Sequence, residues 1–150
     1  MDRNRLEYTY TFGMDDEQIE DRLQRRETGV LALAADGSAY AVPVAHHYED
    51  ESLYVRVADD GSSTKMTYLE ETDEACFTLY DVDSAGNSWS IVVTGSIRKL
   101  SRAESERFDD TAINESFLDL RLFGEDVEAI DLEIYELEAK SIAGRQTGEG

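Results

Sequence analysis

One run of residues has the composition of a phosphate-binding site: Gly61-Ser62-Ser63-Thr64-Lys65, where a short helix is expected to begin. Free backbone N–H groups and the positive end of a helix dipole favour an anion at such a position. Hydroxyl groups donate hydrogen bonds to phosphate oxygens, and a lysine supplies full charge. Arg56, on the preceding expected strand, is near enough along the chain to add a second cation. Ordinary helix capping by a serine explains the same residues, and the two-glycine nucleotide-binding loop is absent.

Two further segments hold side chains with more than one interpretation. In the expected strand at 40–48, Pro43 indicates an edge or a bulge, where backbone groups remain available to a ligand. His46 and His47 are adjacent in that strand and point to opposite faces, so no shared metal ion is predicted. His46 either faces a ligand pocket or is an ordinary barrel histidine. Trp89, the only tryptophan, is either a packing anchor or a ring that stacks near a planar cofactor.

The rest of the sequence offers no obvious catalytic group. No serine stands in a nucleophile elbow, no nucleophile–base pair is apparent, and carboxylates are too numerous for a pair of them to be informative. The catalytic residues therefore stay unknown at this point.

Acidic residues dominate the composition. The chain has 34 Asp and Glu against 14 Lys and Arg, and its formal net charge is −20. Repulsion across such a surface is screened at molar salt, where the Debye length is roughly 3 Å, which favours a halophilic protein over an ordinary acidic one. Nucleic acid is not expected as a partner, because phosphate backbones need basic surfaces. No apolar run approaches the roughly 20 residues that span a bilayer and no signal peptide is recognised, so a cytoplasmic protein without a membrane partner is expected.

The elements that would position these residues are mostly short strands. Hydrophobic periodicity predicts a helix at Met14–Arg26, whose start is marked by Asp15 and Gln18 as a capping pair. Apolar runs and turn residues predict five strands; these lie at 30–34, 40–48, 53–57, 74–80 and 89–97. Gly95 interrupts the fifth and predicts a bulge or a barrel corner.

After these strands the pattern changes. A capping box at Ser101 to Glu104 predicts a helical region that extends to about Leu122. The alternation at 130–134 favours a sixth strand, although a helical stripe fits the same segment. The sequence thus predicts one domain over 1–150, with an N-terminal arm at 1–13 and a loose tail at 146–150. Its fold class is mainly β (α+β): a six-stranded antiparallel β-barrel, closed or partly open, with a few peripheral helices.

Several of these segments, taken in order, resemble one family. They are Gly29-Val30-Leu31-Ala32-Leu33, Asp36-Gly37, Tyr40-Ala41-Val42-Pro43-Val44, Leu53-Tyr54-Val55, Ser63-Thr64-Lys65, Ala75-Cys76-Phe77 and Ser90-Ile91-Val92-Val93-Thr94-Gly95. Their order and spacing from about Met14 to Leu100 are similar to those of the pyridoxamine 5′-phosphate oxidase-like superfamily. The resemblance implies that family's fold, the FMN-binding split barrel.

The resemblance also implies an FMN-binding homodimer with two cofactors at the subunit interface. In the family a serine, an arginine and a lysine hold the phosphate. Ser63 and Lys65 match two of these, while Thr64 stands where the arginine would be and Arg56 would compensate. The remaining positions implied to contact the flavin come from the second, third and fifth strands. They are Val42, Pro43, Val44, Ala45 and His46; Val57 and Ala58; and, across the dimer, Trp89 and Ser90.

The carboxy-terminal end departs from the true oxidase. That enzyme has a substrate-binding motif with tryptophan and arginine, whereas the last part of this chain contains Ala143-Gly144-Arg145-Gln146 and no tryptophan. Oxidation of pyridoxamine phosphate is therefore not expected, and the shorter nitroimidazole-reductase-like members are the nearer match. The function expected from the resemblance is an FMN-dependent oxidoreductase that acts on a small molecule, with NAD(P)H as an expected electron donor. The alternatives are a non-catalytic flavin carrier or sensor, a barrel that binds deazaflavin F420 or haem, and a cofactor-free barrel.

Overall fold

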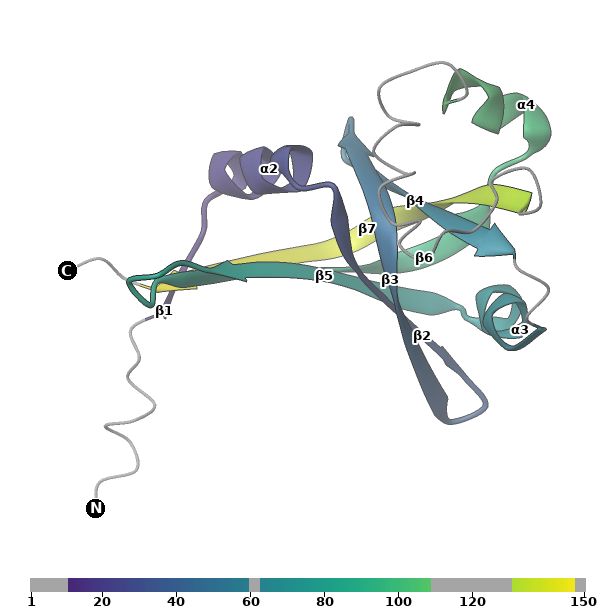
Figure 1. Ribbon diagram of the computed structural model, residues 1–150, viewed down its shortest axis with the longest axis horizontal. Coiled ribbons are helices and arrows are strands. Elements are labelled where there is room, and N and C mark those ends of the chain that lie inside the picture. Colours follow the sequence, from purple (N-terminus) through teal and green to yellow (C-terminus); the bar gives the residue numbers. More distant parts are fainter. Residues whose placement is uncertain (1–10, 60–62, 109–130, 148–150) are drawn as a thin grey trace.

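A computed structural model of the chain describes residues 11–59, 63–108 and 131–147, and most of these belong to strands (Figure 1). The strands are β1 (Thr11–Gly13), β2 (Thr28–Ala35), β3 (Ser38–Glu49), β4 (Ser52–Asp59), β5 (Glu74–Val82), β6 (Ser88–Lys99) and β7 (Asp131–Thr147). The helices are α2 (Asp16–Arg25), α3 (Ser63–Glu71), α4 (Arg102–Ser105) and the 3₁₀ turn η1 (Glu106–Phe108). No helix in these ranges is long and apolar enough to cross a bilayer.

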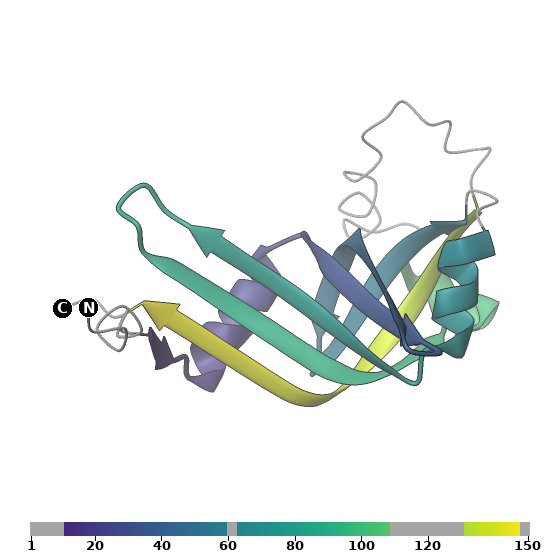
Figure 2. The ribbon, with the colours of Figure 1, turned by 90° about the horizontal axis from the view of Figure 1, so that it is seen from below.

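Six of the strands form a closed antiparallel barrel. Their order is β7-β4-β3-β2-β5-β6, and β6 pairs with β7 again to complete the circle. The short strand β1 adds to the free side of β7. Figure 2 shows the long strands β5, β6 and β7 running side by side through most of the length of the molecule. The fold class expected from the sequence is thus confirmed.

Barrel closure depends on a bulge in the β6–β7 ladder. The register shifts between Thr94 and Gly95, as the glycine in the sequence predicted. A Cβ atom added to Gly95 would lie 1.9 Å from the carbonyl oxygen of Glu138, so no other residue fits without moving the backbone. The φ angle of Gly95 is not in the left-handed region, so the backbone conformation alone does not require glycine. The bulge requires glycine because there is no space for a Cβ atom.

Side chains fill the barrel interior, and a helix closes each end. Alternate residues of every barrel strand point inward, among them Leu31, Val55 and Phe77. Helix α2 adds Ile19 and Leu23 to this core, and α3 adds Leu69. In both views α2 and α3 lie toward opposite ends of the long axis (Figures 1 and 2). A ligand of any size must therefore bind outside the barrel.

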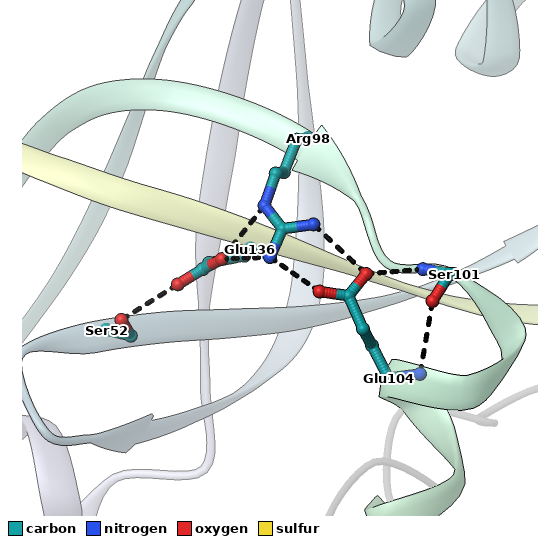
Figure 3. Close-up of polar contacts among 5 residues, drawn as sticks. All are labelled: Ser52, Arg98, Ser101, Glu104 and Glu136. Atoms are coloured by element: carbon teal, nitrogen blue, oxygen red, sulfur yellow. Dashed lines mark hydrogen bonds and ion pairs between the residues drawn. The ribbon is translucent and has the colours of Figure 1, made fainter.

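A second, smaller core lies outside the barrel, where Leu100, Phe108 and Ile134 pack together with Ala45. A polar network holds helix α4 next to this second core (Figure 3). The guanidinium of Arg98 donates to both carboxylate oxygens of Glu104, at 3.1 and 2.9 Å, and also to Glu136 at 3.1 Å. Arg98 and the backbone N–H of Ser101 together hold the pKa of Glu104 at about 2, below its usual range.

The other carboxylate oxygen of Glu136 accepts from the hydroxyl of Ser52 at 2.8 Å. The network therefore ties α4 to three strands, β4, β6 and β7, although these strands come from distant parts of the chain. Ser101 and Glu104 also form the capping box that the sequence predicted.

The structure corrects several sequence-based boundaries. The helix at the Ser101 capping box has only four α-helical residues before η1, and its expected extension over 113–122 lies outside the described residues. The sixth strand is far longer than 130–134. It runs through Gln146 and Thr147, which pair with β1 and are therefore not part of a loose tail. Thr11–Gly13, the last residues of the expected N-terminal arm, form β1 and pair with β7, and the earlier arm residues lie outside the described ranges.

Replacing Gly95 by alanine tests the bulge. We expect Gly95→Ala to lower the free energy of unfolding by about 2 kcal/mol or more, since the added methyl group overlaps backbone atoms that cannot rotate away. Chemical denaturation of the two proteins measures the difference. Gly13→Ala is the matched control, because nothing lies within 4 Å of a Cβ atom there and the change should stay within about 0.5 kcal/mol.

Candidate functional site

Part of the outer face of five neighbouring strands lacks charge. Residues that pair across antiparallel strands share a face, so the register defines complete rows across β3, β2, β5, β6 and β7. Two such rows contain no charged side chain; they are Pro43–Val30–Thr78–Val92–Ala143 and Ala41–Ala32–Cys76–Thr94–Ser141. Tyr80 and Val82 extend the same face of β5 and are 68% and 56% exposed. Such a surface is unexpected in a chain in which 32% of the residues are charged.

A cavity of about 600 Å³ opens at the edge of this face, near the end of α2. Its uncharged wall is formed by backbone and side chains of β2, β3 and β5, and its charged rim by residues that follow α2 and end β5. The lining residues are Arg25, Arg26, Glu27, Thr28, Gly29, Val30, Pro43, Thr78, Leu79, Tyr80 and Asp81. The volume is that of a site for a small organic molecule or part of a cofactor.

Three arginines lie near the end of α2, and two of them contact Trp89. The guanidinium carbons of Arg22 and Arg26 lie 4.9 and 5.4 Å from the centre of the indole ring, within cation–π range. Arg26 also forms an ion pair with Asp81, and this pair lowers the pKa of the Asp81 carboxyl group. Trp89 is only 9% exposed, so the arginines and the barrel cover most of its surface.

The predicted phosphate-binding run stands at the start of α3. Ser63 is the first residue of the helix, Thr64 is exposed and Lys65 is half-buried, while Gly61 and Ser62 lie outside the described residues. The first turn of α3 has no acidic residue, whereas α2 and α4 each begin with one or more. The positive end of the α3 dipole is therefore not neutralised by the helix's own side chains.

The structure divides the predicted site residues between the two faces of the barrel wall. Pro43 is exposed and lines the cavity, and Arg56 is half-buried on β4. Val44, His46 and Val57 instead face the barrel core and are 2–3% exposed, and Val42 packs against the same core. Ala45 is buried in the smaller external core. Ala58 pairs with Leu132 near the end of β4.

The predicted residues also lie in two separate places. The residues at the start of α3 lie at one end of the molecule, whereas Pro43 of β3 lines a cavity with Arg25 and Arg26 at the end of α2. Trp89 and Ser90 begin β6, where the indole ring lies beside the arginines of α2. Because α2 and α3 are at opposite ends in both views, one chain alone does not bring Trp89 to Lys65 (Figures 1 and 2).

His46 connects α2 to the barrel. Its Nε2–H donates to the carbonyl oxygen of Leu23 at 2.9 Å, and its ring lies 5.0 Å from that of Phe77. The other ring nitrogen, Nδ1, is buried and has no hydrogen-bond partner among the described residues. Burial lowers the pKa of His46 to about 4, so the ring is neutral at pH 7. This position gives His46 a structural role, and a contact with a cofactor stays a prediction.

The sequence reasoning missed the residues at the rim of the cavity. The sequence predicts only the end of a helix for Arg25 and Arg26 and only a strand for Thr78 to Tyr80, and it predicts no role for Asp81. One signal was present: the segment Arg22-Leu23-Gln24-Arg25-Arg26 concentrates positive charge in a chain that otherwise has little. Nothing in the sequence, however, placed that segment beside Pro43.

Comparison with protein families gives one match. A family model described as pyridoxamine 5′-phosphate oxidase matches residues 15–146, which includes α2, the strands from β2 to β6, α3 and nearly all of β7. No curated protein matches the chain.

Solved structures share the fold at low sequence identity. A FAD-binding protein from Mesorhizobium loti superposes with a TM-score of 0.76 at 18% identity, covering 92% of this chain and 99% of its own. The FAD binding protein from Mycobacterium smegmatis gives 0.61 at 14%, covering 91% and 97%. The FAD and heme binding protein from the same organism gives 0.67 at 16%, covering 93% and 74%.

The buried neutral state of His46 makes a prediction about acid stability. The pKa of His46 is about 4 when folded and about 6.5 when unfolded, so the unfolded chain takes up the proton first. Stability from the neutral ring is therefore complete above pH 6.5 and is lost as the pH falls toward 4. Between pH 6.5 and pH 4, the free energy of unfolding of the native protein should fall by about 3 kcal/mol more than that of the His46→Gln variant. Glutamine keeps an N–H donor but does not titrate.

Urea denaturation of both proteins across this pH range measures the difference. All carboxyl groups are common to the two proteins, so the effect of their protonation on stability cancels in the comparison. An NMR titration that placed the imidazole pKa of His46 near 6.5 would contradict the prediction.

Proposed function

This chain belongs to the pyridoxamine 5′-phosphate oxidase family, and from that premise we propose that it is an FMN-binding homodimer that works as a flavin-dependent oxidoreductase. The observation that carries the proposal is the uncharged outer face with its 600 Å³ cavity beside Pro43. The names of the structural neighbours, which include FAD-binding proteins, support a flavin over other cofactors.

The start of α3 is the proposed site for the flavin phosphate. Lys65 supplies a half-buried positive charge there, and the free N–H groups of the first turn point toward any anion in front of the helix. The absence of acidic residues from this turn fits a negatively charged ligand. Ser63 and Thr64 add hydroxyl donors, and Arg56 on β4 is the proposed second cation.

The flavin ring is proposed to lie on the outer face along β3, at Pro43. Proline has no N–H to give to a neighbouring strand, and the exposed apolar ring of Pro43 suits contact with an aromatic system. The filled interior leaves no space for the ring inside the barrel. On this basis Val42, Val44 and Val57 support the wall from behind, and Ala45 joins this wall to the smaller external core. Bound flavin would supply the redox chemistry, and the protein would supply binding, orientation and a water-poor surface.

A second copy of the chain is the proposed partner of the uncharged face. Each copy has a formal charge of −20, so two copies repel each other unless the contact excludes carboxylates. The two uncharged rows meet that requirement, and a twofold axis allows the same surface to serve both copies. In such a dimer, Trp89 and Ser90 of one copy are proposed to approach the flavin held by the other. This arrangement would bring Trp89 near Lys65, which one chain keeps apart from it.

The proposed reaction is electron transfer between the flavin and a small molecule, with NAD(P)H as the electron donor. Pyridoxamine phosphate is not the proposed substrate, because β7 ends without the tryptophan of the true oxidase. A nitroimidazole-reductase-like activity is the nearer alternative, and a flavin carrier without turnover is the other. Reduction of the bound flavin by NAD(P)H, followed by reoxidation by a defined acceptor, separates enzyme from carrier.

Flavin retention by Lys65 variants tests the cofactor site. Protein purified at high salt is expected to be yellow with oxidised flavin bands; a deazaflavin or haem spectrum would overturn the proposal. Lys65→Gln should weaken FMN binding about tenfold, because it removes a charge-assisted bond to the phosphate. Lys140 is exposed on β7, so Lys140→Gln is the control and should bind FMN with the affinity of the native protein. The site assignment fails if Lys65→Gln binds FMN with unchanged affinity.

A charge placed on the uncharged face tests the dimer. Val92 is 39% exposed in the middle of one uncharged row, so Val92→Glu would put two carboxylates into a twofold contact. We expect this variant to be a monomer by light scattering at a salt concentration at which the native protein is a dimer. Ala103→Glu, exposed on α4, adds the same charge away from the face and should remain dimeric. A Val92→Glu dimer would exclude this face as the interface.

A further inference from the structure

The cavity beside Pro43 has two arginines at its rim, and neither is used by the flavin phosphate site proposed at α3. We propose that this cavity binds a small organic anion, whose carboxylate or phosphate is held by Arg26 and Arg25 while its apolar part rests on the uncharged wall. The proposal rests on the proposed function to the extent that this anion is the redox substrate of the flavin. Binding of the anion itself does not depend on the flavin.

The contacts of the two arginines leave donors for a ligand. A guanidinium has five N–H donors. In the described structure, Arg26 uses Nη2 toward Asp81, and Arg25 uses Nε toward Asp21 at 2.9 Å. Both side chains line the cavity and both remain partly exposed, at 77% for Arg25 and 43% for Arg26. An anion can therefore bind without breaking either ion pair.

Arg26 is held in place before any ligand arrives. Its guanidinium lies 5.4 Å from the centre of the Trp89 ring and is paired with Asp81. The other oxygen of Asp81 accepts from the backbone N–H of Val82 at 2.8 Å, which fixes the carboxylate in turn. Holding a long side chain in one orientation lowers the entropy lost when it binds a ligand. The carboxylate of Asp81 thus acts mainly as a support for Arg26.

The charges at the rim also favour selectivity for a small ligand with one anionic group. Glu27 and Asp81 balance the two arginines, so the rim is close to neutral in a chain whose surface is strongly negative. A small anion is repelled over much of the acidic surface, and at this rim it meets two arginines side by side. The opposite wall, with Val30, Pro43 and Tyr80, contributes apolar and aromatic surface. A ligand with an apolar body and one anionic group satisfies both sides of the cavity.

The single tryptophan provides a test that does not need the flavin. Trp89 lies beside Arg26, so a ligand on Arg26 should change its fluorescence. The purified protein is titrated at fixed ionic strength with benzoate, phenyl phosphate and benzamide, which share a phenyl ring and differ in the polar group. We expect at least one of the two anions to bind tenfold or more tightly than neutral benzamide. The tighter of the two shows whether the natural group is a carboxylate or a phosphate.

Variants of the rim locate the binding. Arg26→Gln should weaken the tighter anion about tenfold or more and leave benzamide unchanged, and Arg25→Gln should have a smaller effect in the same direction. Arg102→Gln, on exposed α4, removes the same charge elsewhere and should change neither ligand. Equal affinity for anions and benzamide, no binding of any probe, or an unchanged anion affinity in Arg26→Gln each overturns the proposal.

The flavin spectrum separates this proposal from the proposed function. If Arg26→Gln loses the bound flavin, the cavity holds the cofactor phosphate and the anion site is rejected. If the native protein carries no flavin at all and the fluorescence titration still shows the expected pattern, the proposed function fails while the anion site stands.

Discussion

Closure of the barrel depends on the close approach of β6 to β7 at Gly95. The carbonyl oxygen of Glu138 occupies the space that any Cβ atom would need, so the ladder can shift register there and continue along both strands. This ladder joins the end of the chain to its middle, and it brings Arg98 of β6 next to Glu136 of β7. Helix α4 and the external core around Phe108 are positioned by that contact (Figure 3).

A closed barrel with a filled interior restricts where function can be located. Helices α2 and α3 close its ends, and His46 fastens α2 through the carbonyl group of Leu23. A ligand must then use the outer surface, where most of the chain presents carboxylates. The uncharged rows on β3, β2, β5, β6 and β7 are the exception among the described strands. The proposed flavin site, the proposed dimer contact and the cavity thus all depend on the absence of charge from this surface.

The arginines of α2 illustrate how the fold creates a site from residues of ordinary character. Arg22 and Arg26 stand near the end of a helix, where positive charge is favourable for local reasons. The barrel places Trp89 and Asp81 next to them, and both come from strands more than 50 residues later in the chain. The guanidinium groups thereby become ordered parts of a cavity wall.

The local elements and the fold class follow from patterns in the sequence alone. The capping boxes at Asp15 and Ser101 and the strand pattern are short-range features, since the residues responsible are neighbours along the chain. Gly95 marked the position of the bulge, although the residue it meets there, Glu138, is distant along the chain. The sequence also identified Pro43 and the start of α3 as binding candidates. Only the tertiary structure decided that Val44, His46 and Val57 face the core, that Gln146 belongs to β7, and that Arg26 meets Asp81. These outcomes depend on strand register and barrel closure, which are set by contacts between distant residues that no local pattern encodes.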